Sequence, residues 1–98
     1  MSVLAVYQQD PDDKLDYTID WVPFLGGTVA APSDTIATSV WVAPTGITEG
    51  TPASTKTDTT TTAWLSAGTR GDYIVKNKIT TTGGRIREES ILVRVRAN

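Results

Sequence analysis

The amino-acid sequence predicts an all-β fold, an antiparallel β-sandwich of about seven strands with an N-terminal extension. Three observations predict it. Thr alone occurs 17 times in 98 residues, and β-branched residues suit a pleated sheet better than a helix. Apolar and polar residues alternate with a period of two in several short runs. Gly and Pro separate those runs, and no segment carries apolar residues at helical spacing, so we expect no helix.

The first expected strand lies near the N-terminus. Its apolar residues are Val3, Leu4, Val6 and Tyr7. The polar stretch Gln8–Lys14 follows, with a proline inside it. An apolar strip on a polar tether suits an arm that pairs with the sheet edge of a neighbouring molecule; the alternative is an ordinary first strand of the same sandwich. We therefore divide the chain into an arm and linker over residues 1–15 and a sandwich over residues 16–98.

Further strands follow from alternation or from β-branched composition. They are expected in Tyr17–Trp21, Ile36–Val42, Thr59–Ser66, Tyr73–Thr80 and Ile91–Arg96. Glycine or proline follows each of the first four, which marks turns. Gly83-Gly84, between the last two strands, predicts a hairpin.

The three tryptophans are large for so small a domain. We expect Trp21 and Trp64 in the core. Trp41 is opposite in phase to Val40 and Ile36, so it either joins a mixed core face or is exposed. An exposed Trp41 would anchor an interface, because tryptophan is enriched at binding hot spots. Leu92 is out of phase with its own strand and is a second interface candidate.

Charge is distributed unevenly along the chain. The net charge is only −2, too small to favour binding to nucleic acid. Residues 1–58 hold eight acids and two bases, whereas residues 59–98 hold three acids and seven bases. Identical subunits can dock an acidic face to a basic face, and the acidic linker is then expected to meet Arg94 and Arg96 of a neighbour. The alternative is a sandwich whose charges simply stay solvated.

Composition excludes several kinds of chemistry. The chain has no His and no Cys, so a Ser-His-Asp triad, His-ligated zinc, disulfides and cysteine nucleophiles are all excluded within it. The acidic residues Asp10–Asp16 lack the glycine and closing glutamate of a calcium loop. We expect no enzyme, no cofactor and no metal. Neither a leader peptide nor a membrane-spanning stretch is expected.

The second half of the chain resembles fibronectin type III and related immunoglobulin-like modules. The resemblance lies in Leu65-Ser66-Ala67-Gly68-Thr69, then Arg70-Gly71-Asp72-Tyr73-Ile74-Val75, and the strand at Ile91–Val95. It implies an immunoglobulin-like sandwich in which Tyr73 is the corner tyrosine, with its hydroxyl bonded to nearby backbone. Such a resemblance concerns the fold and is silent on function.

A second resemblance covers most of the chain, from about Asp10 to Arg96. It is carried by Asp10-Pro11-Asp12, Leu15–Trp21, Leu25, Asp34–Trp41 and the Thr-rich Thr57–Trp64, in this order. The chain is similar here to small tailed-phage virion proteins of the fiber–tail adaptor type, encoded near capsid and connector genes. It departs from them at Val22 and in a longer Gly26–Pro32 loop.

This resemblance implies a non-enzymatic structural protein that joins other virion proteins at a head–tail or tail–fiber junction. Its expected partners are connector, tail, fiber or capsid proteins and further copies of itself, with no nucleic acid and no membrane. Its expected location is the virion, assembled in the cytoplasm of the bacterial host. A capsid decoration protein is the first alternative. A carbohydrate- or receptor-binding β-sandwich is the second.

Overall fold

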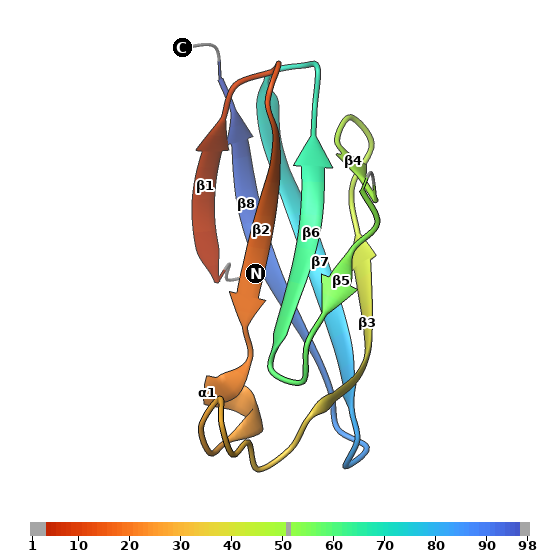
Figure 1. The fold of residues 1–98 in the computed structure, drawn as a ribbon. Coiled ribbons are helices and arrows are strands. Elements are labelled where there is room, and N and C mark those ends of the chain that lie inside the picture. Colours follow the sequence, from red (N-terminus) through yellow and green to blue (C-terminus); the bar gives the residue numbers. More distant parts are fainter. Residues whose placement is uncertain (1–3, 51, 97–98) are drawn as a thin grey trace.

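The computed structural model describes residues 4–50 and 52–96 as two packed β-sheets (Figure 1). Sheet A holds, in spatial order, β1 (Ala5–Gln9), β8 (Ile86–Val95), β7 (Gly71–Thr81) and β3 (Ile36–Val42). Sheet B holds β2 (Lys14–Asp20), β6 (Thr60–Ser66) and β4 (Thr48–Glu49), and β5 (Thr55–Lys56) also pairs with β6. The expected all-β sandwich is confirmed.

The chain passes back and forth between the two sheets, and the immunoglobulin-like character expected for its second half stays a prediction. Strands β2, β6 and β4 form one layer, and β8, β7 and β3 form the other. All pairings are antiparallel except that of β1, which lies parallel to β8 with Val6 opposite Leu92. The Tyr73 hydroxyl donates to the carbonyl of Thr69 at 2.8 Å, which is the bond expected of a corner tyrosine.

The longest pairing is the hairpin of β7 and β8. The Thr81 N–H donates to the Arg85 carbonyl at 2.8 Å, and Gly84 has a φ of 91°. That φ lies in the left-handed region, which glycine enters without steric cost. The hairpin predicted from Gly83-Gly84 is therefore confirmed.

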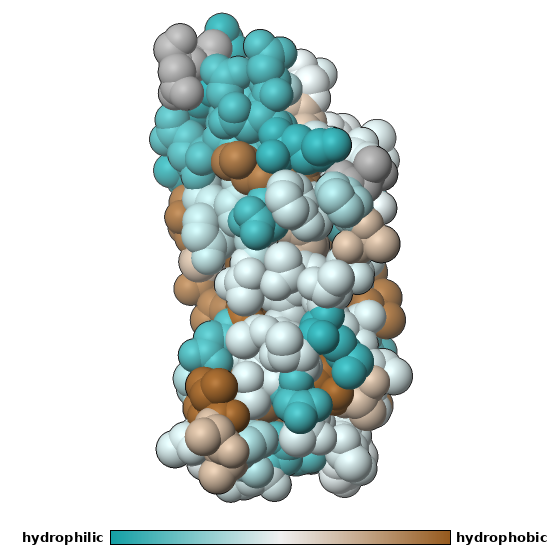
Figure 2. All heavy atoms as spheres, viewed as in Figure 1, coloured by the Kyte–Doolittle hydropathy of each residue, from teal (hydrophilic) through white to brown (hydrophobic). Residues whose placement is uncertain are grey.

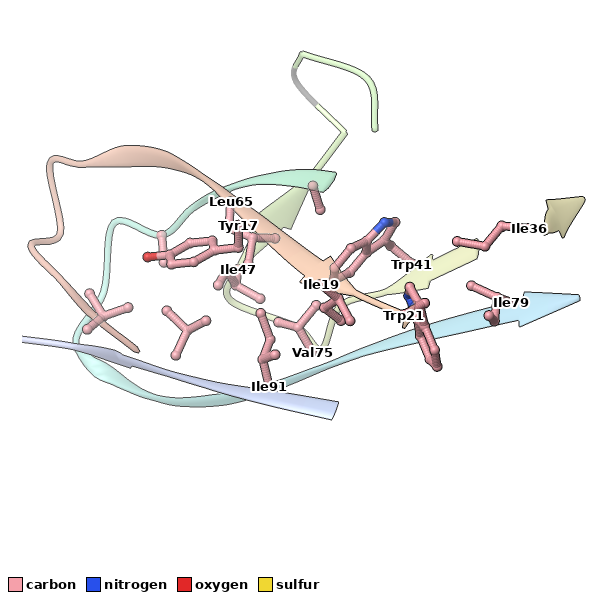
Figure 3. Packing of buried hydrophobic residues seen from close by; sticks show 14 of the residues in the cluster. Tyr17, Ile19, Trp21, Ile36, Trp41, Ile47, Leu65, Val75, Ile79 and Ile91 are labelled. Carbon is pink, nitrogen blue, oxygen red and sulfur yellow. The ribbon is translucent and has the colours of Figure 1, made fainter. Parts of the chain in front are cut away.

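The core lies between the sheets and includes one polar network. Alternate residues of each strand point inward, among them Val75, Ile79 and Ile91 (Figure 3). Asn77, fully buried, accepts hydrogen bonds from Trp21 Nε1 at 3.2 Å and from the Thr61 hydroxyl at 2.7 Å. Buried polar groups without partners are costly, so this network ties the two sheets together in one arrangement.

Trp41 lies in the core, so the exposed alternative for this residue is wrong. It is 8% exposed, and Ile36 on the same strand is also buried. The pairing of β3 with β7 shifts register between Ile36 and Thr38. A β-bulge of this kind changes which residues face inward. Both residues therefore point to the core although their sequence spacing is odd.

Trp64 is not in the core, contrary to the expectation from its size. It is only half-buried and lies beside Asp16 on the outer face of sheet B. Its neighbours Ala63 and Leu65 are fully buried. Because successive residues of a strand face opposite sides, Trp64 must point outward.

One short helix, α1 (Val22–Leu25), departs from the expectation of no helix. Arg85 of the β7–β8 hairpin holds this end of the sandwich. Its guanidinium lies 4.5 Å from the centre of the Phe24 ring and forms a 3.1 Å ion pair with Asp34.

None of the described residues forms a helix long and apolar enough to cross a membrane.

Among the described residues, the acidic first part and the basic second part of the chain form a salt bridge with each other only at the end of the sandwich that holds α1. The Arg85–Asp34 ion pair joins the two halves of the chain. The other salt bridges among residues 4–50 and 52–96 lie within the second half.

Candidate interaction surfaces

The outer face of sheet A carries an apolar row. Val6, Leu92 and Ile74 lie on three adjacent strands in direct register. Val6 is 54% exposed, whereas Leu92 and Ile74 are half-buried. Leu4 extends the row, because its N–H donates to the Ser90 carbonyl at 2.7 Å and its side chain is exposed. Three sequence candidates, Leu4, Val6 and Leu92, therefore come together on one face.

The N-terminal segment is paired within its own chain. Residues 5–9 form the edge strand β1, which corresponds to the alternative of an ordinary first strand. Val3, the first residue of the expected strip, lies outside the described residues. Tyr7 points inward and packs against Tyr17, with 4.7 Å between the ring centres. Tyr7 is therefore placed against the core and not on the outer face.

A buried amide fixes the end of β1. Gln9 is 2% exposed, and its Nε2 donates to the carbonyls of Asp13 and Leu65. Its Oε1 accepts a 2.6 Å bond from the hydroxyl of Tyr17. Burial, followed by electrostatic interactions with Asp13 and with Tyr7, raises the pKa of Tyr17 to about 12. The neutral hydroxyl thus remains the donor at ordinary pH.

The acidic residues of the linker serve the turn between β1 and β2. The Asp10 N–H donates to the Asp13 carboxylate, and the Asp12 N–H donates to the Asp10 carboxylate, both at 2.9 Å. Such bonds are typical of aspartate in turns. No three acidic side chains among the described residues are grouped as a metal site.

Arg94 and Arg96 already contact an acid in their own chain. Arg96 Nη2 lies 2.7 Å from the Asp72 carboxylate, and Arg94 Nε lies 3.9 Å from it. All three side chains are about half exposed. They form a solvated cluster at the end of sheet A next to the apolar row.

The edges of the two sheets differ in charge. Strands β1 and β3, at the two edges of sheet A, contain no charged residue. In sheet B, β2 carries Lys14, Asp16 and Asp20, β4 carries Glu49 and β5 carries Lys56. Natural proteins usually place charges on exposed edges to prevent pairing with other chains. Sheet A lacks this protection at both edges.

Exposed valines accompany the uncharged edges. Val40 and Val42 on β3 are each 55% exposed, close to the value for Val6 on β1. Figure 2 views the sandwich from the side of sheet B. Residues of intermediate hydropathy cover most of the middle of that face, hydrophilic residues gather at its upper end, and apolar residues lie mainly along its lateral margins and near its lower end. These margins are where β1 and β3 lie in Figure 1.

Sequence reasoning missed Ile74, Val40 and Val42 as surface residues. The alternation of Ile74 with the buried Val75 was a usable signal for Ile74. For Val40 and Val42 the local signal was ambiguous, because their alternation with Trp41 does not show which set faces the core, and the bulge that turns them outward depends on the pairing with β7.

The described residues form no pocket for a small molecule. The exposed apolar residues described above lie on strand edges and on a sheet face, which are surfaces that other proteins can bind by adding a strand or packing against the face.

Comparison with known proteins assigns the chain to a family. A comparison with curated protein sequences finds no match. A family model described as "Podophage GP4 fiber-tail adaptor protein gp77" matches residues 9–94. That range extends from the end of β1 almost to the end of β8, so it includes every strand of the sandwich apart from most of β1. The chain belongs to this family of podophage fiber–tail adaptor proteins, which agrees with the resemblance drawn from its sequence.

Proposed function

We propose that the chain is a non-enzymatic structural protein of the virion, which joins other virion proteins at the head–tail or tail–fiber junction. The observation that carries the proposal is the family match over residues 9–94. Because the family match covers the sandwich itself, the surfaces that contact other virion proteins are expected on the sandwich. We propose its sheet edges, its N-terminal strand and the apolar row on sheet A as these surfaces.

The proposal includes self-association in a symmetric assembly. Single edge contacts between small domains are weak, but a closed ring engages every copy through two of them. The exposed apolar residues of sheet A supply the contact area, and the charged cluster of Asp72, Arg94 and Arg96 supplies a rim that fixes register.

Particles assembled without the protein test this function. A nonsense mutation in its gene, complemented or not by a plasmid copy, gives two matched particle preparations for electron microscopy. We expect the uncomplemented particles to lack the fibers or the tail, while filled heads remain. Complete, infectious particles without the protein would contradict the proposal. Intact tails on fragile heads would instead identify a capsid decoration protein.

A further inference from the structure

We infer that copies of this chain join through the two uncharged edges of sheet A, with β1 of one copy pairing with β3 of the next. The inference rests on the proposed self-association and names the strands that carry it. The two strands lie at opposite edges of one sheet, as Figure 1 shows. Each copy therefore offers one β1 edge and one β3 edge, and the contact is head-to-tail.

Both strands have the features of an edge that accepts another strand. In the part of the chain that the structure describes, each has a single strand neighbour, β8 for β1 and β7 for β3. An edge strand presents unpaired N–H and C=O groups to any extended chain beside it. β1 has five residues and β3 has seven, so the shorter strand finds a backbone partner along its whole length. The backbone of Ile36, the first residue of β3, is already bonded by Lys56 Nζ and by the Asp58 carbonyl, so the edge offered to a partner is residues 37–42, and neither that segment nor β1 contains a charged residue.

The direction of the strands fits continuation of the sheet. β3 and β8 are both antiparallel to β7, and β1 is parallel to β8. β1 and β3 therefore run the same way, and a neighbour added in the same orientation pairs its β1 in parallel with β3. The apolar side chains then continue across the junction, because Val6 of one copy comes beside Val40 and Val42 of the next on the outer face.

Charge complementarity favours this parallel arrangement. The C-terminal end of β1 leads into the turn that contains Asp10, Asp12 and Asp13. In the parallel pair, that turn lies near Val42, whose partner on β7 is Lys76. Lys76 is opposite Ser90 on β8, so its own row holds no carboxylate. The separation of two strand spacings, about 10 Å, allows attraction at low ionic strength. An antiparallel pairing would place the acidic turn at the other end of β3.

Complementation between two edge variants tests the inference. Val40→Lys places a charge on the β3 edge, and Val6→Lys places one on the β1 edge. Both valines are more than half exposed, so the variants should keep the circular dichroism spectrum and melting temperature of the parent. Val29→Lys, at a 70% exposed loop valine outside both strands, is the matched control. Should either lysine variant fail to fold, the Val40→Thr and Val6→Thr pair replaces it.

Masses in solution are measured by sedimentation over a range of concentrations. We expect the parent and Val29→Lys to associate, each edge variant alone to associate at least about tenfold more weakly, and their equimolar mixture to form dimers. The mixture dimerises because Val40→Lys keeps an intact β1 and Val6→Lys keeps an intact β3. Lys76→Glu should weaken association about two- to fivefold and reduce its dependence on salt.

Other outcomes overturn the inference in different ways. Dimers of Val6→Lys alone would indicate a symmetric β3–β3 contact, and dimers of Val40→Lys alone a symmetric β1–β1 contact. If Val29→Lys weakens self-association as much as the edge variants do, the association is nonspecific. A parent that stays monomeric at all concentrations would remove the inference and leave the proposed virion function to the particle experiment, which does not depend on it.

Discussion

The two lateral margins of the sandwich are held together differently. At the margin formed by β1, β2 and the turn between them, which we call the closed margin, Gln9 and Tyr17 join the sheets through buried hydrogen bonds. At the margin formed by β3, β4 and β5, the open margin, the sheet B edge is interrupted between Glu49 and Thr55. Only β4 and β5, of two residues each, stand opposite the seven-residue β3.

Polar atoms are less well satisfied at the open margin. The indole N–H of Trp41 is buried and has no hydrogen-bond partner in the described part of the chain, whereas that of Trp21 has two. Two hydrogen bonds join the sheets at this margin. Lys56 Nζ donates to the Ile36 carbonyl at 3.0 Å, and the Ile36 N–H donates to the backbone carbonyl of Asp58 at 2.9 Å. Burial of Glu49 at this margin raises the pKa of its carboxyl. Side-chain hydrogen bonds between the sheets are thus fully buried at the closed margin and only partly buried at the open margin.

The largest expected effect concerns the closed margin. Gln9→Ala removes two donated bonds and leaves the buried hydroxyl of Tyr17 without its acceptor. We expect a loss of about 2 to 3 kcal/mol in the free energy of unfolding, measured with urea. Gln8→Ala, at the exposed neighbouring position, is the control and should change stability by less than about 0.5 kcal/mol. Equal effects of the two variants would remove the distinction between the margins.

The two buried tryptophans give a matched pair of substitutions. Trp21→Phe loses hydrogen bonds to Thr61 and Asn77, while Trp41→Phe loses a donor that has no partner. The loss of apolar contact is similar in the two variants. Trp21→Phe should therefore destabilise the protein by about 1 to 2 kcal/mol more than Trp41→Phe does. The same urea unfolding measures both variants. A larger loss of unfolding free energy for Trp41→Phe would show that the Trp41 indole N–H is hydrogen-bonded in solution.

Alkaline pH should open the closed margin. Burial raises the pKa of Tyr17 to about 12 in the folded protein, from 10 in a solvated tyrosine. The stability that this group contributes is therefore present below pH 10 and is lost as the pH rises from about 10 to about 12. Melting temperatures across this range should fall less steeply for Tyr17→Phe than for the parent. Tyr73→Phe, which leaves Tyr17 intact, should retain the parent's slope.

The smallest expected effect on stability concerns Asp34, whose carboxylate forms the ion pair with Arg85. Hydrogen bonding by Thr81 above all, and by Arg85 and two backbone N–H groups, lowers the pKa of Asp34 to about 2. Its contribution to stability is present above about pH 4 and is lost as the pH falls toward about pH 2. Asp34→Asn should thus melt slightly below the parent at neutral pH, and the difference should vanish near pH 2. A difference that persists at pH 2 would mean that the carboxylate charge is not its origin.

Much of the fold follows from the sequence, because alternation and turn residues are local signals. β3 spans the residues expected for it, and the last hairpin turns at the expected glycines. Features that depend on a distant partner were not predictable. The bulge near Ile36 requires knowledge of β7, and the parallel position of β1 requires knowledge of β8. α1 has only four residues, too few to show helical periodicity.

The candidate surface was predicted in part for the same reason. Leu4, Val6 and Leu92 were identified from local sequence, whereas the register that joins Leu92 to Ile74 is a long-range property. Trp64 shows the opposite error. Its size was given more weight than its alternation with Ala63 and Leu65, and the alternation decides its position.

The parallel pairing of β1 has a consequence for the order in which the protein folds during synthesis. Ala5 is paired with Ile91, so β1 leaves the ribosome long before its partner strand has been made. Contacts so distant in sequence form late, because closing a long loop loses chain entropy before the contact contributes any stabilising free energy. Among the described strands, β1 is therefore separated from its partner for the longest time, and until β8 is made both edges of β1 lack a strand neighbour.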